Sequence, residues 1–423
     1  MTLNNKITIN LNGYQYQVSV NFLLIFRLIE NILESEAITG GAFMANVFDY
    51  LHWRGDLTMQ NDGFNDIDAL ILSRLSYFPF DGIVSENADE KISIKNASEI
   101  FFSSEDNNDK ILWKGDTELL KYAAESERFK NMKLSGYVNL VEQEKQMQFS
   151  AVIIEVTEDR HFISFRGTDN SVVGWQEDFN MYYMFPLPSQ KMAVDYFVTA
   201  SKILNGSFIM GGHSKGGNLA VYAAAFSPED LQKRIIRVYN HDGPGFDRKS
   251  IQESGFQAVK DKIHTYVPQS SIFGMMFEHQ EDYTIVKSNE KGFLQHDIYS
   301  WEVERTKLVH LSTMTSTSVF FDHTITQFVA DLSVEQRKDF IEGIFSLLKN
   351  TEDKTFNEIV ENWKTNSGAI LKSLKNMDSK TRSLIISTLL NFIKCAKNNF
   401  SDINPLSKEN RKSKKKDKDK DKR

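Results

Sequence analysis

The chain has 423 residues, of which 41% are hydrophobic and 25% charged, and a formal net charge of −7. These proportions are typical of a globular protein with a large core, and the acidic balance argues against nucleic acid as the main partner. The single cysteine, Cys395, excludes an intrachain disulfide and suits a reducing compartment.

Residues 1–45 are predicted to be an N-terminal extension. Residues 6–11 alternate between polar and apolar types, which favours a strand. Residues 18–29 are apolar, but Asn21, Arg27 and nearby Glu30 make the segment too short and too charged to span a bilayer. No basic stretch precedes it and no small-residue cleavage site follows, so we expect an amphipathic helix packed on a core and a cytoplasmic protein.

Residues 46–83 are more informative than the extension and are expected to hold an entry helix packed on the main domain. Asn65 or Asp66 is a candidate cap for a helix whose apolar residues recur at helical spacing through Leu75. Residues 90–135 are polar and charged with scattered apolar positions, which predicts helices and loops.

An α/β core is predicted to begin near Gln148. Strands expected at 149–156 and 160–168 are joined by a short turn. Later strands, at 235–240, 262–267 and 283–287, alternate with helical segments. This alternation favours a mostly parallel central sheet with helices on both faces.

The most informative stretch is residues 207–220, SFIMGGHSKGGNLA. An apolar run ends in Gly-x-Ser-x-Gly and passes directly into a helix-forming segment, which predicts a strand, a sharp turn and a helix. Gly212 and Gly216 would allow that turn, because a Cβ there would collide with neighbouring backbone. Ser214 would then lie at the apex, with the N–H of Lys215 directed to where an oxyanion forms.

The C-terminal part is predicted to be helical from about residue 322 to 396, and the Lys/Asp-rich residues 407–423 to be disordered. The expected divisions are an extension (1–45), an α/β domain (46–320), a helical region (321–400) and a tail (401–423).

Together, several motifs resemble the class 3, fungal-type triacylglycerol lipases. In chain order these are Phe165-Arg166-Gly167-Thr168, Trp175 and Asp178, Gly212-His213-Ser214-Lys215-Gly216, Gly243-Pro244 and His296. From about residue 46 to 304 the chain more closely resembles an uncharacterised bacterial family of lipase-like proteins. The resemblance implies an α/β-hydrolase fold and leaves the C-terminal helices outside.

The resemblance also implies roles for individual residues. Thr168 would be the second oxyanion donor beside the Lys215 N–H, and Asp178 would hold the Thr168 hydroxyl. A polar loop with a helix cap is the structural alternative for this pair.

The order of the residues makes His296 the leading candidate for the base. His310 and His323 follow later, in Ser/Thr-rich or helical surroundings, and His213 is expected to point away from the site.

The acid is not assigned by the motifs. In the lipases it follows the strand after the Gly-Pro turn, where residues 266–274 of this chain contain no carboxylate, and Ser271 is a candidate for its place. Asp242, at the end of the preceding strand, keeps the order Ser, Asp, His, although it also fits an Asp-Gly-Pro turn. Glu278 and Asp282 are further options.

The expected function is hydrolysis of carboxylic esters, of lipids or other acyl groups, by Ser214 and His296. No metal or organic cofactor is expected, because no cluster of His, Cys and carboxylates has ligand spacing. The alternative is a catalytically weak or inactive α/β-hydrolase scaffold that binds partners through its C-terminal helices and basic tail. Membrane-surface contact through that tail is a third option, weakened by Asp417, Asp419 and Asp421. The oligomeric state is not predicted.

Overall fold

The computed structural model describes residues 6–11, 14–19, 44–104, 107, 110–349, 351, 355, 358–359 and 362–403. Contacts divide the chain into two units, Met1–Ala42 and Phe43–Arg423. The described part of the first unit is an antiparallel hairpin of β1 (Lys6–Leu11) and β2 (Tyr14–Ser19). The strand at 6–11 is confirmed, and the helix predicted at 18–29 lies outside the described residues apart from Val18 and Ser19, which belong to β2.

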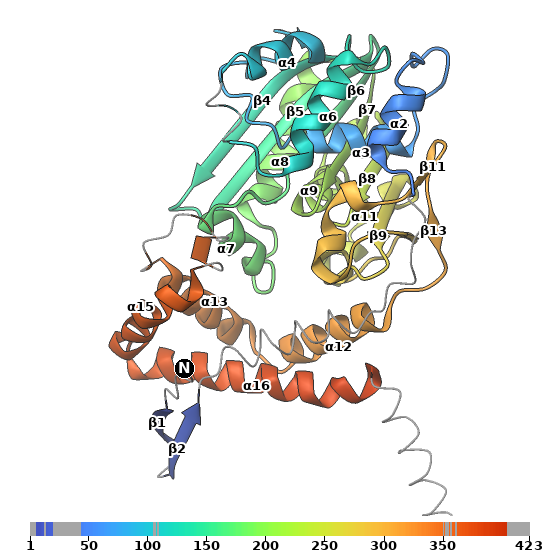
Figure 1. Ribbon diagram of the computed structural model, residues 1–423. Helices are drawn as coiled ribbons and strands as arrows, with labels where there is room; N and C mark the ends of the chain where they lie inside the picture. The colour runs from blue at the N-terminus through green and yellow to red at the C-terminus, as the bar shows by residue number, and fades with distance from the viewer. Residues whose placement is uncertain are drawn as a thin grey trace, which may run out of the picture. The chain divides into compact units, whose positions relative to one another are not determined.

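The second unit is built around a nine-stranded mixed sheet (Figure 1). Its spatial order is β13-β10-β9-β8-β7-β6-β5-β4-β3, and β6 to β10 are parallel while the outer pairs are antiparallel. The strands are β3 (Ile92–Ser93), β4 (Lys133–Glu142), β5 (Met147–Thr157), β6 (Arg160–Phe165), β7 (Ser207–His213), β8 (Ile235–His241), β9 (Ile263–Pro268), β10 (Tyr283–Val286) and β13 (His310–Leu311); β11 (Val303–Glu304) and β12 (Lys307–Leu308) form a separate pair.

Helices cover both faces of this sheet. Those of the α/β part are α2 (Val47–Arg54), α3 (Asp66–Leu75), α4 (Ile94–Phe102), α6 (Lys114–Glu125), α7 (Val172–Asn180), α8 (Pro188–Ile203), α9 (Lys215–Phe226), α10 (Glu229–Gln232) and α11 (Ser254–Val259). Short 3-10 turns are η1 (Ser250–Gln252), η2 (Lys260–Lys262), η3 (Phe273–Met275), η4 (Gly292–His296) and η5 (Ile298–Ser300). The helices that follow and whose bounds are described are α12 (Ser316–Ala330), α13 (Val334–Leu348), α15 (Trp363–Asn376) and α16 (Ser379–Ile403).

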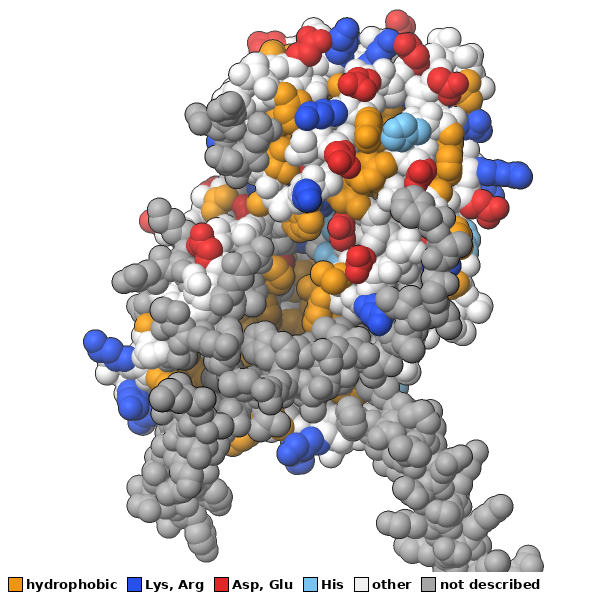
Figure 2. All heavy atoms as spheres, in the orientation of Figure 1, with side chains coloured by type: hydrophobic (Ala, Val, Ile, Leu, Met, Phe, Trp, Pro, Cys, Tyr) orange, Lys and Arg blue, Asp and Glu red, His pale blue; other side chains and the backbone are white. Residues whose placement is uncertain are grey.

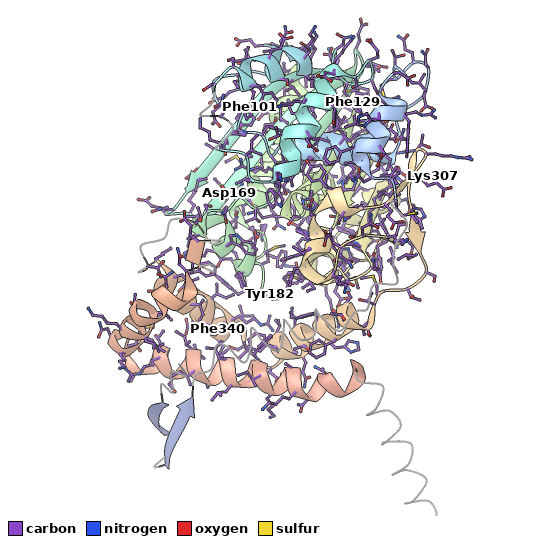
Figure 3. All side chains as sticks on the ribbon, viewed as in Figure 1. Phe101, Phe129, Asp169, Tyr182, Lys307 and Phe340 are labelled. Carbon is purple, nitrogen blue, oxygen red and sulfur yellow. The ribbon has the colours of Figure 1, made fainter. Side chains whose placement is uncertain are left out.

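The two faces have separate hydrophobic cores, because successive strand residues point to opposite sides. Phe162 of β6 packs in the core with α2, α3, α4 and α6, whereas its neighbour Ile163 packs in the core with α8, α9 and α11. Figure 3 labels Phe101 and Phe129, which belong to the first of these cores, and Phe340, which packs in a third cluster among the C-terminal helices. The predicted sheet with helices on both faces is therefore confirmed.

The sheet begins earlier than predicted. Strands β3 and β4 precede Gln148 and pair at its antiparallel edge, whereas residues 90–135 were expected to hold only helices and loops. The alternation of β4 is interrupted, because the register shifts between Ser135 and Val138, around Gly136 at φ 61°. A bulge of this kind hides a strand from a period-two pattern.

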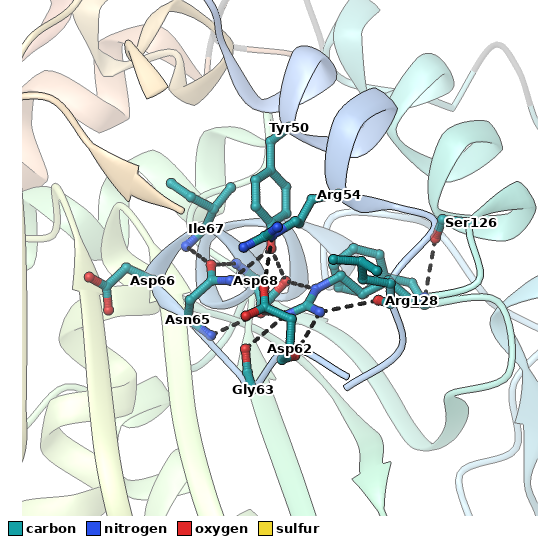
Figure 4. Close-up of polar contacts among 12 residues, drawn as sticks. Tyr50, Arg54, Asp62, Gly63, Asn65, Asp66, Ile67, Asp68, Ser126 and Arg128 are labelled. Carbon is teal, nitrogen blue, oxygen red and sulfur yellow. Dashed lines mark hydrogen bonds and ion pairs between the residues drawn. The ribbon is translucent and has the colours of Figure 1, made fainter. Parts of the chain in front are cut away.

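A buried ion cluster fixes α3 to the chain that leads into β4 (Figure 4). Arg128 places Nε 2.6 Å and Nη2 2.5 Å from the two carboxylate oxygens of Asp68, and both side chains are fully buried. The remaining guanidinium protons go to the carbonyl oxygens of Leu57, Asp62 and Gly63 at 2.9–3.2 Å. Because all five donors have acceptors, the charge is well compensated.

Asn65 begins the same helix, as predicted. Its side chain accepts hydrogen bonds from the N–H groups of Ile67 and Asp68, and Asp68 accepts the Asn65 N–H in return. On the surface, Figure 2 shows acidic and basic side chains interspersed over the end of the α/β part that carries α2, α4 and α6. No helix in the described ranges is both long and apolar enough to cross a bilayer.

Candidate active site

Ser214 lies in a sharp turn between β7 and α9. Its backbone has φ 58° and ψ −136°, a conformation that a residue with a Cβ adopts only under strain. A Cβ on Gly216 would lie 2.1 Å from the Phe165 carbonyl oxygen, and one on Gly212 would lie 2.4 Å from that of Gly216. The predicted strand, turn and helix are present, and the Ser214 side chain makes no cap hydrogen bond to the helix.

Asp242 lies at the end of the next strand. Strand β8 pairs with β7 in parallel, and the Ser214 N–H donates to the carbonyl of His241, 2.9 Å away, immediately before Asp242. Asp242 itself has φ 55°, and its N–H donates to the Tyr266 carbonyl of β9 at 2.8 Å. The turn therefore directs a buried carboxylate to the same sheet edge as Ser214.

His296 pairs with that carboxylate. Its Nδ1 lies 2.6 Å from Asp242 Oδ2, and the imidazole is about one-fifth exposed. With Nδ1 used by Asp242, Nε2 is the nitrogen left for a proton transfer. The structure thus brings together two residues that lie 54 positions apart in the sequence.

Ser271 does not replace the acid but contacts it. Its hydroxyl donates to Asp242 Oδ1, and its Oγ accepts the Gly274 N–H at 3.0 Å. The other acid candidates are engaged elsewhere or exposed: Glu278 pairs with Arg248 at 3.0 Å, and Asp282 is exposed. Among the carboxylates considered, Asp242 is the one next to His296.

Of the three other histidines considered as the base, His213 lies in a different place from the one predicted. His310 and His323 are exposed, in β13 and α12. His213, expected to point away, lies against His296: the ring centroids are 4.4 Å apart, and His213 Nε2 lies 2.8 Å from the His296 carbonyl oxygen. Burial holds the pKa of His213 well below its usual value, so the ring is neutral and an Nε2–H can donate to that carbonyl. His213, the residue before Ser214, therefore packs against His296, the candidate base.

Tyr77, which the sequence analysis did not single out, supports His213 from the other side. Its hydroxyl lies 3.2 Å from His213 Nδ1 and 3.1 Å from the His213 carbonyl oxygen. Only its place near the end of an amphipathic helix pattern was visible in the sequence, which carries no signal for such a contact.

Ser214 is half-buried, and no hydrogen bond joins its Oγ to His296 within the described part of the chain. Catalytic hydrogen bonds are often long before substrate binds, so this geometry is compatible with a proton transfer. The ring of Phe273, 4.6 Å from that of His296, limits the space beside the imidazole.

Thr168 follows β6, the other neighbour of β7. The loop lies directly against the elbow, since a Cβ on Gly167 would be 3.1 Å from the Ser214 Cβ. The Thr168 hydroxyl donates to Asp178 Oδ2 in α7, the contact expected from the sequence. The opening N–H of α9, on Lys215, follows Ser214 directly.

The sequence motifs give a role to the backbone N–H of Lys215 and none to its side chain. It is 1% exposed, and its Nζ lies 3.1 Å from both Glu177 Oε2 and Asp178 Oδ1. The sequence gives one signal for these contacts: Lys215 lies at the start of an otherwise largely apolar helix. An ammonium buried there needs acidic partners.

These features define an α/β-hydrolase fold with a serine elbow. The chain belongs to the Mbeg1-like family, whose model matches residues 123–346, more than half of the sequence. The match starts later than the predicted resemblance and extends through α12 into α13, which were expected to lie outside it.

The solved structures that are similar to the chain include two lipases. M37 lipase has 16% identity and a TM-score of 0.31, with 49% of this chain and 68% of that one covered. The lipase of Rhizomucor miehei in complex with its propeptide has 14% identity and a TM-score of 0.29, with 52% and 68% covered. None of the curated proteins matches this chain.

Proposed function

We propose that the protein is a serine hydrolase of carboxylic esters, with lipid or other acyl esters as substrates. The observation that carries the proposal is the 2.6 Å contact between His296 Nδ1 and Asp242 Oδ2, at the sheet edge where Ser214 lies in a strained turn. A buried carboxylate bound to one imidazole nitrogen fixes the tautomer and leaves the other nitrogen as the base.

In the proposed reaction, Ser214 Oγ attacks the ester carbonyl carbon and His296 Nε2 takes the hydroxyl proton. Asp242 stabilises the imidazolium, and Ser271 holds the carboxylate in place through its other oxygen. The oxyanion accepts hydrogen bonds from the backbone N–H of Lys215 and from Thr168. When the tetrahedral intermediate collapses, the leaving alcohol takes the proton from His296. Water then attacks the acyl-enzyme, giving the acid and free Ser214.

A second candidate is a scaffold of this fold that binds partners without hydrolysis. The observation that favours it is the absence, in the described residues, of a hydrogen bond between Ser214 Oγ and His296. The proposed tail interactions, with a partner or a membrane surface, involve residues outside those described.

We propose a cytoplasmic location on the composition and the single cysteine, and cell fractionation with a tagged full-length chain tests it.

A fluorophosphonate probe separates the two candidates. The wild-type protein should be labelled covalently, and Ser214→Ala should not, because the probe reacts only with an activated serine. Ser103→Ala, which removes an exposed hydroxyl at the end of α4, is the matched control and should be labelled as fast as wild type. A folded wild-type protein that stays unlabelled would favour the scaffold.

A further inference from the structure

The residue after the proposed nucleophile has two separate contacts with the site. Its backbone N–H opens α9 beside Ser214, while its side chain turns into the protein and is buried. The ammonium lies 3.1 Å from one oxygen each of Glu177 and Asp178, which are consecutive residues of α7. An ion pair therefore joins the first residue of the elbow helix to a helix that follows the Thr168 loop.

Each carboxylate has further partners. Asp178 accepts the Thr168 hydroxyl through Oδ2, the oxygen that Lys215 does not contact. Glu177 accepts the N–H groups of Gln148 and Ser189, each at 3.0 Å. Glu177 thus anchors α7 to β5 and α8, and Asp178 carries the connection from Lys215 to Thr168.

The charges in this cluster depend on one another. Burial alone would lower the pKa of Lys215, but the charges of Asp178 and Glu177 outweigh it and raise the pKa, so the ammonium persists. Burial raises the pKa of Asp178, and Lys215 opposes that shift. Without the ammonium, the buried carboxylate of Glu177 and the partly buried carboxylate of Asp178 would lie side by side uncompensated, and α7 would lose this ionic link to α9.

The hydroxyl of Thr168 is already used as a donor, and this defines what the link from Lys215 to Thr168 does. A hydroxyl has one proton, and here the Thr168 hydroxyl donates it to Asp178. While Asp178 stays ionised, the Thr168 group that can donate to an oxyanion is its backbone N–H. The position of the loop backbone then decides how well the oxyanion is held.

We propose that Lys215 is a positioning residue. Its ammonium group acts through Asp178 to hold the Thr168 loop against the serine elbow. The inference rests on the proposed ester hydrolysis for its catalytic consequence, but the loop position is measurable without turnover. The side chain of the elbow residue thus organises one oxyanion donor while its N–H supplies the other.

Lys215→Met tests the proposal, since it removes the charge and keeps much of the volume. Hydrogen–deuterium exchange of residues 167–171 should become faster in the variant. The kcat for a p-nitrophenyl ester, per site titrated with the fluorophosphonate probe, should fall about 10²-fold, as expected when a group is misplaced by about 1 Å. KM should stay within about twofold, because the loss falls on the transition state.

Arg128→Met is the matched control, because it also removes a buried cation paired with a carboxylate. It should lower the melting temperature but leave both the exchange of 167–171 and kcat per titrated site unchanged. A merely structural role for Lys215 predicts the same pattern for Lys215→Met, and that result would overturn the proposal.

Two further variants keep the test decisive. If Lys215→Met does not fold, Lys215→Met combined with Glu177→Gln keeps the net charge of the wild-type cluster, and exchange of 167–171 must still be faster. Lys215→Met combined with Asp178→Asn should lose no more kcat than Asp178→Asn alone, because both changes act on one link. Additive losses of kcat would contradict the proposed link from Lys215 through Asp178.

If the wild-type protein shows neither labelling nor turnover, the proposed function fails. The exchange measurement still decides the role of Lys215.

Discussion

Two buried ion clusters in the described part of the chain, those of Arg128 and Lys215, use similar groups differently. In the first, Arg128 and Asp68 are both fully buried, and all five guanidinium protons have acceptors. In the second, one ammonium serves two carboxylates, and Asp178 keeps a quarter of its side chain exposed. Several buried polar atoms around this second cluster have no partner among the described residues, namely Gln148 Nε2, Gln176 Oε1 and Ser189 Oγ.

The difference indicates what each cluster does. A cluster with every donor satisfied specifies one arrangement of α3 and the chain before β4, and its value is structural. A cluster with incomplete compensation costs stability, and natural proteins accept such costs mainly at functional sites. The Lys215 cluster lies beside the strained Ser214 turn, and the Arg128 cluster contacts none of the candidate catalytic residues.

The largest expected effect separates the two regions by activity. Asp242→Asn should lower kcat for a p-nitrophenyl ester by about 10⁴-fold, because the amide no longer fixes the tautomer of His296. Asp68→Asn, the same change in the Arg128 cluster, should leave kcat per titrated site unchanged. Steady-state kinetics on both variants measure this, and an unchanged rate in Asp242→Asn would remove Asp242 from the triad.

The next effect separates the regions by stability. Arg128→Met should cost about 3–5 kcal/mol of unfolding free energy, since it leaves the Asp68 carboxylate buried and uncompensated. Urea denaturation gives the value. Asp242→Asn, whose partner is a partly exposed histidine, should cost much less. Equal losses in the two variants would show that burial alone, and not the completeness of the network, sets the stability.

Glycine substitutions sharpen the comparison at the backbone. Gly216→Ala should cost about 3 kcal/mol, because the new Cβ would lie 2.1 Å from a backbone oxygen of the neighbouring strand. Gly63→Ala, at a carbonyl that accepts from Arg128, should cost less than about 0.5 kcal/mol, because nothing lies within 4 Å of its Cβ. Thermal denaturation of both variants checks the contrast, and a tolerated Gly216→Ala would contradict the tight elbow.

The smallest effect is a pH dependence that belongs to the active-site side. Burial lowers the pKa of His241 to about 3. Between that value and its ordinary value of about 6.5 the unfolded chain binds the proton and the folded chain does not, so stability falls as pH falls below about 6.5. At pH 5 the loss is about 2 kcal/mol from His241, and the lowered pKa of His213 acts in the same direction.

Urea denaturation between pH 5 and pH 8 measures this loss. His241→Phe, which keeps a ring to stack on Tyr239 and Tyr266, should flatten the dependence by the same amount. A variant with the wild-type slope would show that His241 is not the source.

Much of the fold could be predicted because its signals are local. The β7 strand, the elbow and α9 follow from a short apolar run, two glycines and a helix-forming segment, and the cap of α3 follows from Asn65. Strand β4 was missed because its bulge around Gly136 breaks the alternation on which the prediction depends. The domain boundaries predicted at 45, 320 and 400 stay predictions, while contacts place a division after Ala42.

The candidate site shows the same division more sharply. By itself the sequence determined Ser214 at a strand-to-helix turn, because strand, turn and helix propensities act over a few residues. Only the tertiary structure shows that Asp242, and not Glu278 or Asp282, lies beside His296, because that contact depends on which strand lies beside β7 and on where a distant turn places His296. It also decided that the Lys215 side chain turns inward to Glu177 and Asp178, since ion pairs form between residues that packing brings together, 38 positions apart for Lys215 and Glu177.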